Sequence, residues 1–227
     1  FPFFFAPAAY GEARFQPWEE GVFSQVQEQY GAEAAERLRS VHGLILEYQD
    51  APVEKQLEIV NDTLNDLPWL TDQEKWSEED YWATPFETLT TFGGDCEDMA
   101  IGKFVMLRAM GVPKNKLSLA YVKLKTTGES HMVLLYGRIP GETPLVLDNI
   151  VRSIQPAPER KDLVGVFVFD ADGKFWLISD DGVKRSVLSE VSGRKLGKLE
   201  KVKARILETR EFYRKYNAGR PLLPEDS

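Results

Sequence analysis

The spacing of apolar residues along the chain changes near Pro113. Before this point, apolar side chains recur every three or four residues, which is the pattern of a helix with one buried face. The stretches 18–49, 52–68 and 96–110 follow this pattern, with Gly31 inside the first. After Pro113, apolar and polar residues alternate or form short apolar runs, as they do in strands. We therefore expect helices in the first half of the chain and a sheet in the second.

The second half contains several predicted strands, at residues 117–125, 131–136, 145–150, 164–169 and 175–178. Asp-Gly pairs within 170–174 and 180–182 lie between apolar runs and predict hairpin turns. The first of these also looks superficially like a calcium loop, but it lacks the later ligands and the bidentate glutamate of an EF-hand. Residues 196–216 return to helical spacing with a charged outer face. The order predicts an α+β fold with an antiparallel sheet and a C-terminal helix.

A length of 227 residues suits one domain with an ample core. We expect this domain to span residues 18–216. Residues 1–17 are predicted to be a separate N-terminal segment, either the remnant of a trimmed export signal or an aromatic stretch tucked against the domain. Residues 217–227 are predicted to be a tail that frays from Pro221 onward.

Composition narrows the classes of partner. The chain has 36 acidic and 28 basic residues and a net charge of −8. The sequence also has no basic patch with interleaved aromatic residues. Both observations argue against nucleic acid as a binding partner. No apolar run approaches the roughly 20 residues needed to cross a bilayer, so a membrane-spanning segment is not expected. The single cysteine cannot form a disulfide within the chain.

This cysteine lies in residues 93–98, Gly-Gly-Asp-Cys-Glu-Asp, directly before a strongly apolar stretch. The glycine pair allows a sharp turn, and Asp95 is a good helix N-cap with Asp98 three residues on as its capping partner. The pattern predicts that Cys96 lies in the first turn of a buried helix that ends near Gly111. There the helix dipole favours the thiolate form of the sulfur.

A catalytic thiol needs a base and a group that orients the base. The chain has two histidines. His42 falls inside a helical stretch, so we interpret it as structural. His131 lies on a predicted strand, and Asp148 ends the next one. Cys96, His131 and Asp148 are therefore the predicted nucleophile, base and orienting acid.

Three acids beside the thiol raise a difficulty. Asp95, Glu97 and Asp98 should raise the pKa of Cys96 unless something offsets their charge. Successive helical residues are about 100° apart, so Asp95 and Asp98 lie on one side, where they can share a calcium ion that Glu97 reaches less easily. From spacing alone, a calcium site and a pair of helix caps are equally good interpretations.

Four segments together resemble the papain-like and transglutaminase-like superfamily, and more narrowly the bacterial transglutaminase-like cysteine proteinases of the LapG type. The resemblance covers roughly residues 54–169, and its motifs are Asp80–Glu87, the 93–98 box, His131–Leu134 and Leu147–Asn149. It implies a fold in which N-terminal helices and a central Cys-bearing helix pack on an antiparallel sheet. It also implies a cysteine protease that uses Cys96, His131 and Asp148.

Calcium dependence is a further implication of the resemblance, with Asp95, Glu97 and Asp98 as the implicated ligands. LapG-type proteases act in the periplasm and cut a large biofilm adhesin in its N-terminal region, near a pair of alanines. The resemblance therefore implies this adhesin as the substrate. It also implies a second partner, the periplasmic domain of an inner-membrane cyclic-di-GMP receptor that sequesters the protease.

Two alternative functions use the same residues. Attack of the cysteine on a substrate carbonyl gives a thioester, which water hydrolyses in a protease. If a lysine amine attacks the thioester instead, the protein is a transglutaminase or another acyltransferase. Nothing in the triad distinguishes the two reactions. The other alternative is a non-catalytic calcium-binding module on the same fold. The presence of Cys96, His131 and Asp148 in this order argues against the module, and the resemblance favours proteolysis.

Overall fold

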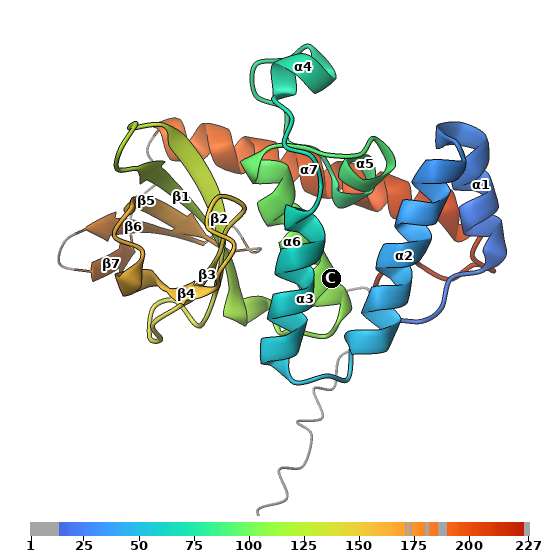
Figure 1. Cartoon of the computed structure of the whole chain (residues 1–227), viewed down its shortest axis with the longest axis horizontal. Coiled ribbons are helices and arrows are strands. Elements are labelled where there is room, and N and C mark those ends of the chain that lie inside the picture. The colour runs from blue at the N-terminus through green and yellow to red at the C-terminus, as the bar shows by residue number, and fades with distance from the viewer. Residues whose placement is uncertain (1–13, 171, 173, 180–181, 186–189, 225–227) are drawn as a thin grey trace, which may run out of the picture.

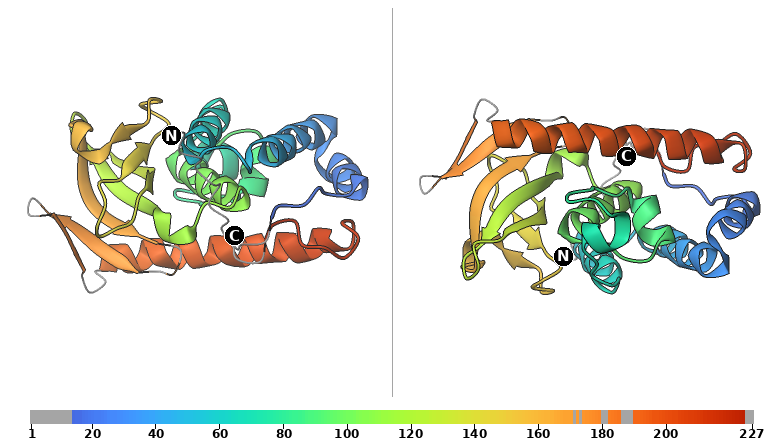
Figure 2. Two further views of the ribbon diagram at one scale, coloured as in Figure 1. Left: turned by 90° about the horizontal axis from the view of Figure 1, so that it is seen from below. Right: turned by 90° about the horizontal axis from the view of Figure 1, so that it is seen from above.

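A computed structural model describes residues 14–170, 172, 174–179, 182–185 and 190–224 of the protein. The helices are α1 (Glu20–Tyr30), α2 (Ala32–Tyr48), α3 (Val53–Asn65), α4 (Asp72–Trp76), α5 (Pro85–Thr90), α6 (Cys96–Ala109) and α7 (Glu190–Arg214), with short 3₁₀ turns at Lys114–Lys116 and Ala157–Glu159. The N-terminal helices lie beside the sheet (Figure 1), and the long α7 runs along one side of both (Figure 2). No helix among the described residues is both long and apolar enough to cross a membrane.

The sheet is antiparallel throughout its described pairs and has the order β4-β3-β2-β1-β5-β6-β7. Its strands are β1 (Leu117–Leu124), β2 (Ser130–Tyr136), β3 (Leu145–Leu147), β4 (Gln155–Pro156), β5 (Leu163–Phe169), β6 (Phe175–Ser179) and β7 (Gly182–Arg185). The predicted α+β class is confirmed: helices come first, the Cys-bearing α6 packs on β1 and β2, and α7 follows the sheet.

Three details of the predicted helices and strands are wrong. The C-terminal helix, predicted at 196–216, spans Glu190–Arg214. The stretch 18–49 forms two helices, because Gly31 has φ +92°, a left-handed conformation that interrupts the helix. The strand predicted at 145–150 ends at Leu147, because the side chain of Asp148 accepts a hydrogen bond from the Ile150 N–H and closes a turn. The predicted hairpins are confirmed by the pairing of β5 with β6 and of β6 with β7; Ala171, Gly173, Asp180 and Asp181 lie outside the described residues.

Helix α6 is buried on almost every side. Its residues Met99, Ala100, Ile101 and Leu107 are at most 3% exposed, and they pack between α3, α5 and the inner face of the sheet. Gly111, with φ +90°, follows the helix as predicted. Because α6 is fixed from several directions, its first turn is a rigid platform for Cys96.

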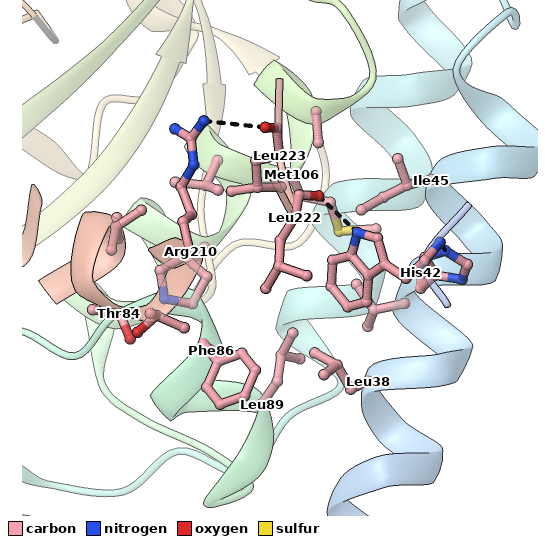
Figure 3. A pocket seen from close by; sticks show the side chains of 18 of the residues that line it. Leu38, His42, Ile45, Thr84, Phe86, Leu89, Met106, Arg210, Leu222 and Leu223 are labelled. Atoms are coloured by element: carbon pink, nitrogen blue, oxygen red, sulfur yellow. Dashed lines mark hydrogen bonds between the residues drawn. The ribbon is translucent and has the colours of Figure 1, made fainter. Parts of the chain in front are cut away.

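The C-terminal segment docks between the helices. Leu222 is only 4% exposed, and its carbonyl accepts a hydrogen bond from the Trp18 indole at 2.7 Å. The prediction that the chain frays from Pro221 is therefore wrong for residues 221–224; residues 225–227 lie outside the described part. An apolar cavity of about 90 Å³ is lined by residues of α2, α5, α6 and α7. Leu222 is among the side chains that line it (Figure 3). His42 also lines this cavity, 8% exposed, and its Nε2 accepts from the Trp18 N–H, which confirms its structural role.

Candidate active site

Each glycine of the 93–98 box is required by a different contact. Gly93 has φ +119°, and a β-carbon there would lie 2.5 Å from the Pro68 carbonyl oxygen. A β-carbon on Gly94 would lie 2.4 Å from a carboxylate oxygen of Asp98. Gly94 also bridges to Trp69, which ties the box to the preceding loop. The predicted sharp turn before Cys96 is confirmed.

Cys96 opens α6 and is half-buried. Its Sγ donates a hydrogen bond to Oε2 of Glu97 at 2.7 Å, and the backbone N–H of Met132 on β2 donates to the sulfur. The thiol therefore lies beside the strand that carries His131. Burial is the main reason that the pKa of Cys96 is well above the ordinary thiol value, and the charges of Glu97 and Asp95 raise it further.

His131 and Asp148 form a buried pair. His131 Nε2 lies 2.7 Å from Asp148 Oδ1, and the two residues are 3% and 1% exposed. Burial alone would raise the pKa of Asp148, but the hydrogen bonds and charges of His131, Ile150 N–H and Arg160 lower it to about 2. An ionised carboxylate only accepts hydrogen bonds, so Nε2 must carry the proton. Nδ1 is then the nitrogen of neutral His131 that can accept a proton.

Two further residues, Asn65 and Arg160, hold Asp148 in place. Asn65 Nδ2 donates to the backbone carbonyl of Asp148 at 2.8 Å, and Arg160 Nη2 donates to Asp148 Oδ2 at 2.6 Å. Sequence reasoning missed both. Arg160 follows a short 3₁₀ turn and belongs to no periodic pattern, so nothing in the sequence marks it as a partner of Asp148.

A cluster of three carboxylates adjoins the turn that carries Cys96. Asp72, Asp95 and Asp98 each offer an oxygen within 4.8 Å of the others. One oxygen of each, namely Asp72 Oδ1, Asp95 Oδ1 and Asp98 Oδ2, is buried with no hydrogen-bond partner among the described residues. Sequence reasoning missed Asp72, which lies in α4, far from the box along the chain.

These carboxyls are held in an environment that disfavours their charge. Burial, followed by the charges of Glu97 and Asp98, raises the pKa of Asp95 to about 9. Burial raises the pKa of Asp98 to about 7, although the Ala83 N–H and the Lys75 ammonium oppose the shift. Burial also raises the pKa of Asp72. Three converging oxygens without protein donors are the ligand type that a hard cation such as calcium takes, so the residues fit such an ion.

Glu97 does not belong to the group of Asp72, Asp95 and Asp98; it forms a second group with Asp95 and Cys96, whose ligand atoms also lie within 4.8 Å of one another. Its Oε2 accepts from Cys96, and its Oε1 lies 3.3 Å from Nζ of Lys195 on α7. Lys195 also pairs with Asp80 at 3.1 Å. Burial alone would lower the pKa of Lys195, but these two carboxylates raise it.

The predicted capping box at the start of α6 is wrong. Asp95 is the N-cap residue, but its side chain makes no capping hydrogen bond. Asp98 Oδ1 instead accepts from the Ala83 N–H at 2.6 Å, which draws the residue toward the preceding loop. The simple alternative in which Asp95 and Asp98 serve only as caps therefore does not describe their contacts.

Comparison with known proteins identifies the family of this chain. A sequence profile of the bacterial transglutaminase-like cysteine proteinases matches residues 27–161. The calcium-bound structure of Legionella pneumophila LapG is 34% identical, with a TM-score of 0.68, and the match covers 81% of this chain and 97% of that one. Another LapG structure from the same organism is 34% identical and an EGTA-treated one 33%; each has a TM-score of 0.68 and covers 82% of this chain and 96% of its own. A comparison with curated proteins finds no match. The chain belongs to the bacterial transglutaminase-like cysteine proteinases and is a LapG-type cysteine protease.

Proposed function

We propose that this protein is a calcium-dependent endopeptidase that uses Cys96 as nucleophile, His131 as general base and acid, and Asp148 as orienting acid. The observation that carries the proposal is the buried 2.7 Å hydrogen bond between His131 and Asp148, together with the bond from the backbone N–H of Met132, the next residue of β2, to the Cys96 sulfur. A nucleophile, a base and an orienting group in this arrangement are the requirements of acyl transfer through a thioester.

In the proposed reaction, Nδ1 of His131 takes the thiol proton, and the hydrogen bond from Cys96 to Glu97 breaks. The sulfur attacks the peptide carbonyl, and His131 then protonates the leaving amine. Water hydrolyses the thioester with His131 again acting as the base. The backbone N–H of Cys96, at the N-terminus of α6, would donate to the oxyanion.

Asp72, Asp95 and Asp98 would hold calcium through their unpartnered oxygens. The ion would offset negative charge next to the thiol, which is the difficulty that the three acids of the box create. Calcium-bound and EGTA-treated forms of LapG support this choice of ion. Glu97, the remaining predicted ligand, would serve the same site only after leaving Cys96 and Lys195.

The biological setting follows from the LapG likeness. We propose that the protein acts in the periplasm on the N-terminal region of a large biofilm adhesin, near paired alanines. Sequestration by the periplasmic domain of an inner-membrane cyclic-di-GMP receptor would regulate it. We retain residues 18–216 as the proposed catalytic domain.

An adhesin N-terminal fragment with an Ala-Ala pair is the direct test. We expect the protein to cut this fragment in calcium, and Cys96→Ser to lower the rate by about 10³-fold or more. EGTA should abolish cleavage, and added calcium, but not magnesium, should restore it. Cleavage by Cys96→Ser at the wild-type rate would contradict the triad, and full activity in EGTA would remove calcium from the mechanism. Transfer of the fragment to a lysine amine in place of hydrolysis would favour the transglutaminase alternative.

A further inference from the structure

Arg160 is buried against the orienting acid of the proposed triad. Its side chain is 2% exposed, and Nη2 donates to Asp148 Oδ2 at 2.6 Å. Asp148 Oδ1 is used by His131 Nε2 at 2.7 Å and by the Ile150 N–H at 2.9 Å. The two oxygens of the carboxylate therefore have different partners, and the Arg160 contact helps to fix the orientation of the carboxylate plane relative to the imidazole.

The guanidinium of Arg160 is itself held by a second carboxylate. Arg160 Nε donates to Asp162 Oδ1 at 2.9 Å and Nη2 donates to Asp162 Oδ2 at 2.7 Å. This two-point contact orients the planar guanidinium, so that Nη2 also points at Asp148. The side chain of Asp162 is 43% exposed, whereas that of Asp148 is fully buried. The partly exposed carboxylate of Asp162 thus orients Arg160, which in turn contacts the buried carboxylate of Asp148.

The terminal torsion of an aspartate is broad, so a carboxylate without a partner on Oδ2 can rotate. Asp148 follows the short strand β3, and without Arg160 its carboxylate would keep hydrogen-bond partners on Oδ1 alone, from His131 and the Ile150 N–H. The titratable and charged groups that interact with Asp148 are His131 from β2, the buried Lys103 from α6, and Arg160 and Asp162 from the segment after β4. Of these, Arg160 is the one that contacts Oδ2.

We propose that Arg160, oriented by Asp162, is a positioning residue of the protease: it locks the Asp148 carboxylate so that Oδ1 holds His131 in the Nε2–H tautomer. The proposal rests on the proposed triad for its importance in catalysis, but the geometry that it describes can be measured without any substrate. Arg160 acts through Asp148 and does not touch the reacting atoms.

The test is ¹⁵N NMR of protein that carries ¹⁵N-labelled histidine. The two histidines of the chain give two sets of ring signals. A His42→Gln variant assigns them. In the wild type we expect a protected Nε2–H proton on His131 at neutral pH. In Arg160→Met, which keeps an unbranched apolar stem but removes the guanidinium, we expect this proton to exchange rapidly and the neutral ring to populate both tautomers. Unchanged His131 signals in a folded Arg160→Met protein would overturn the proposal.

Asp162→Ala removes the anchor at the surface and answers the question if Arg160→Met does not fold. We expect faster exchange of the Nε2–H proton, and a kcat for the adhesin fragment that is about tenfold lower with KM unchanged, because misplaced catalytic groups lower the rate of the chemical step. For Arg160→Met we expect a loss of about 10²-fold in kcat. Glu20→Ala, which removes a similar two-point arginine contact between α1 and Arg39, is the matched control and should change neither signal nor rate.

The two kinds of readout separate this proposal from the proposed function. If the wild type does not cut the fragment, the proposed substrate fails, and the His131 signals still decide the role of Arg160. If Asp162→Ala leaves both the proton exchange and kcat at wild-type values, Arg160 is not oriented by Asp162 and the proposal is overturned.

Discussion

Replacing Asp98 with asparagine tests whether the acidic cluster needs a bound cation. Asp98 is fully buried: Oδ1 accepts from the Ala83 N–H, and Oδ2 has no partner among the described residues. Burial raises the pKa of this carboxyl from 3.8 to about 7. Asparagine keeps the Oδ1 acceptor and the volume of the side chain, but it cannot ionise.

The sign of the effect follows from the two pKa values of Asp98. Between 3.8 and about 7, the metal-free folded protein keeps a proton that the unfolded chain has released. The free energy of unfolding therefore falls as the pH rises through this window. From about pH 5 to about pH 7, two units at about 1.4 kcal/mol each amount to a loss of about 3 kcal/mol. Calcium should remove this loss, because it binds the ionised carboxylate.

Urea unfolding, followed through the fluorescence of the five tryptophans, measures this free energy. In EGTA, we expect the wild type to lose about 3 kcal/mol more than Asp98→Asn between about pH 5 and pH 7. In millimolar calcium the wild-type curve should be flat over the same range. Asp62→Asn changes an exposed carboxylate on α3 and is the control. Parallel curves for the wild type and Asp98→Asn in EGTA would refute the reasoning.

Two other variants probe the thiol and the core. Glu97→Gln removes the carboxylate that accepts a hydrogen bond from Cys96 at 2.7 Å, so we expect the thiol pKa to fall. Alkylation of Cys96 by iodoacetamide at neutral pH should then be about tenfold faster, the equivalent of one pKa unit. An unchanged alkylation rate would contradict this reasoning. Leu107→Ala opens a cavity at a fully buried position of α6 and should lower the free energy of unfolding by about 2–5 kcal/mol in urea. Leu207→Ala, at a position 60% exposed, should change it by less than about 0.5 kcal/mol, and equal effects of the two would show that the core assignment is wrong.

The helices and strands could be predicted where local chemistry decides the structure. Gly111 ends α6 because a glycine tolerates a positive φ, and the change in apolar spacing after Pro113 marks the start of the sheet. The docking of the C-terminal segment could not be predicted in this way. The bond between Trp18 and Leu222 joins residues 204 positions apart, and a few residues with two leucines carry no periodic pattern.

Some residues of the candidate site could likewise be predicted from the sequence, and others could not. Cys96, His131 and Asp148 could be selected because the chain offers one cysteine and two histidines, and because the predicted elements order them. Asp72 and Arg160 could not, since aspartate and arginine are common and these two meet the site only through folding. Asp72 reaches the cluster because its Oδ2 accepts from the Tyr81 N–H, which folds α4 back toward the box.

The start of α6 has to satisfy two opposing requirements, and its acidic side chains divide between two sets of partners. The thiol needs neighbours that favour its negative form, whereas the three aspartates add negative charge when they are ionised, and the Lys75 ammonium interacts with all three. Asp95 and Asp98 turn toward Asp72, and Glu97 turns toward Cys96 and Lys195. Lys195 lies on α7, beyond the residues 27–161 that match the family profile. The C-terminal helix thus supplies a cation to the catalytic box, which supports our proposal that α7 belongs to the catalytic domain.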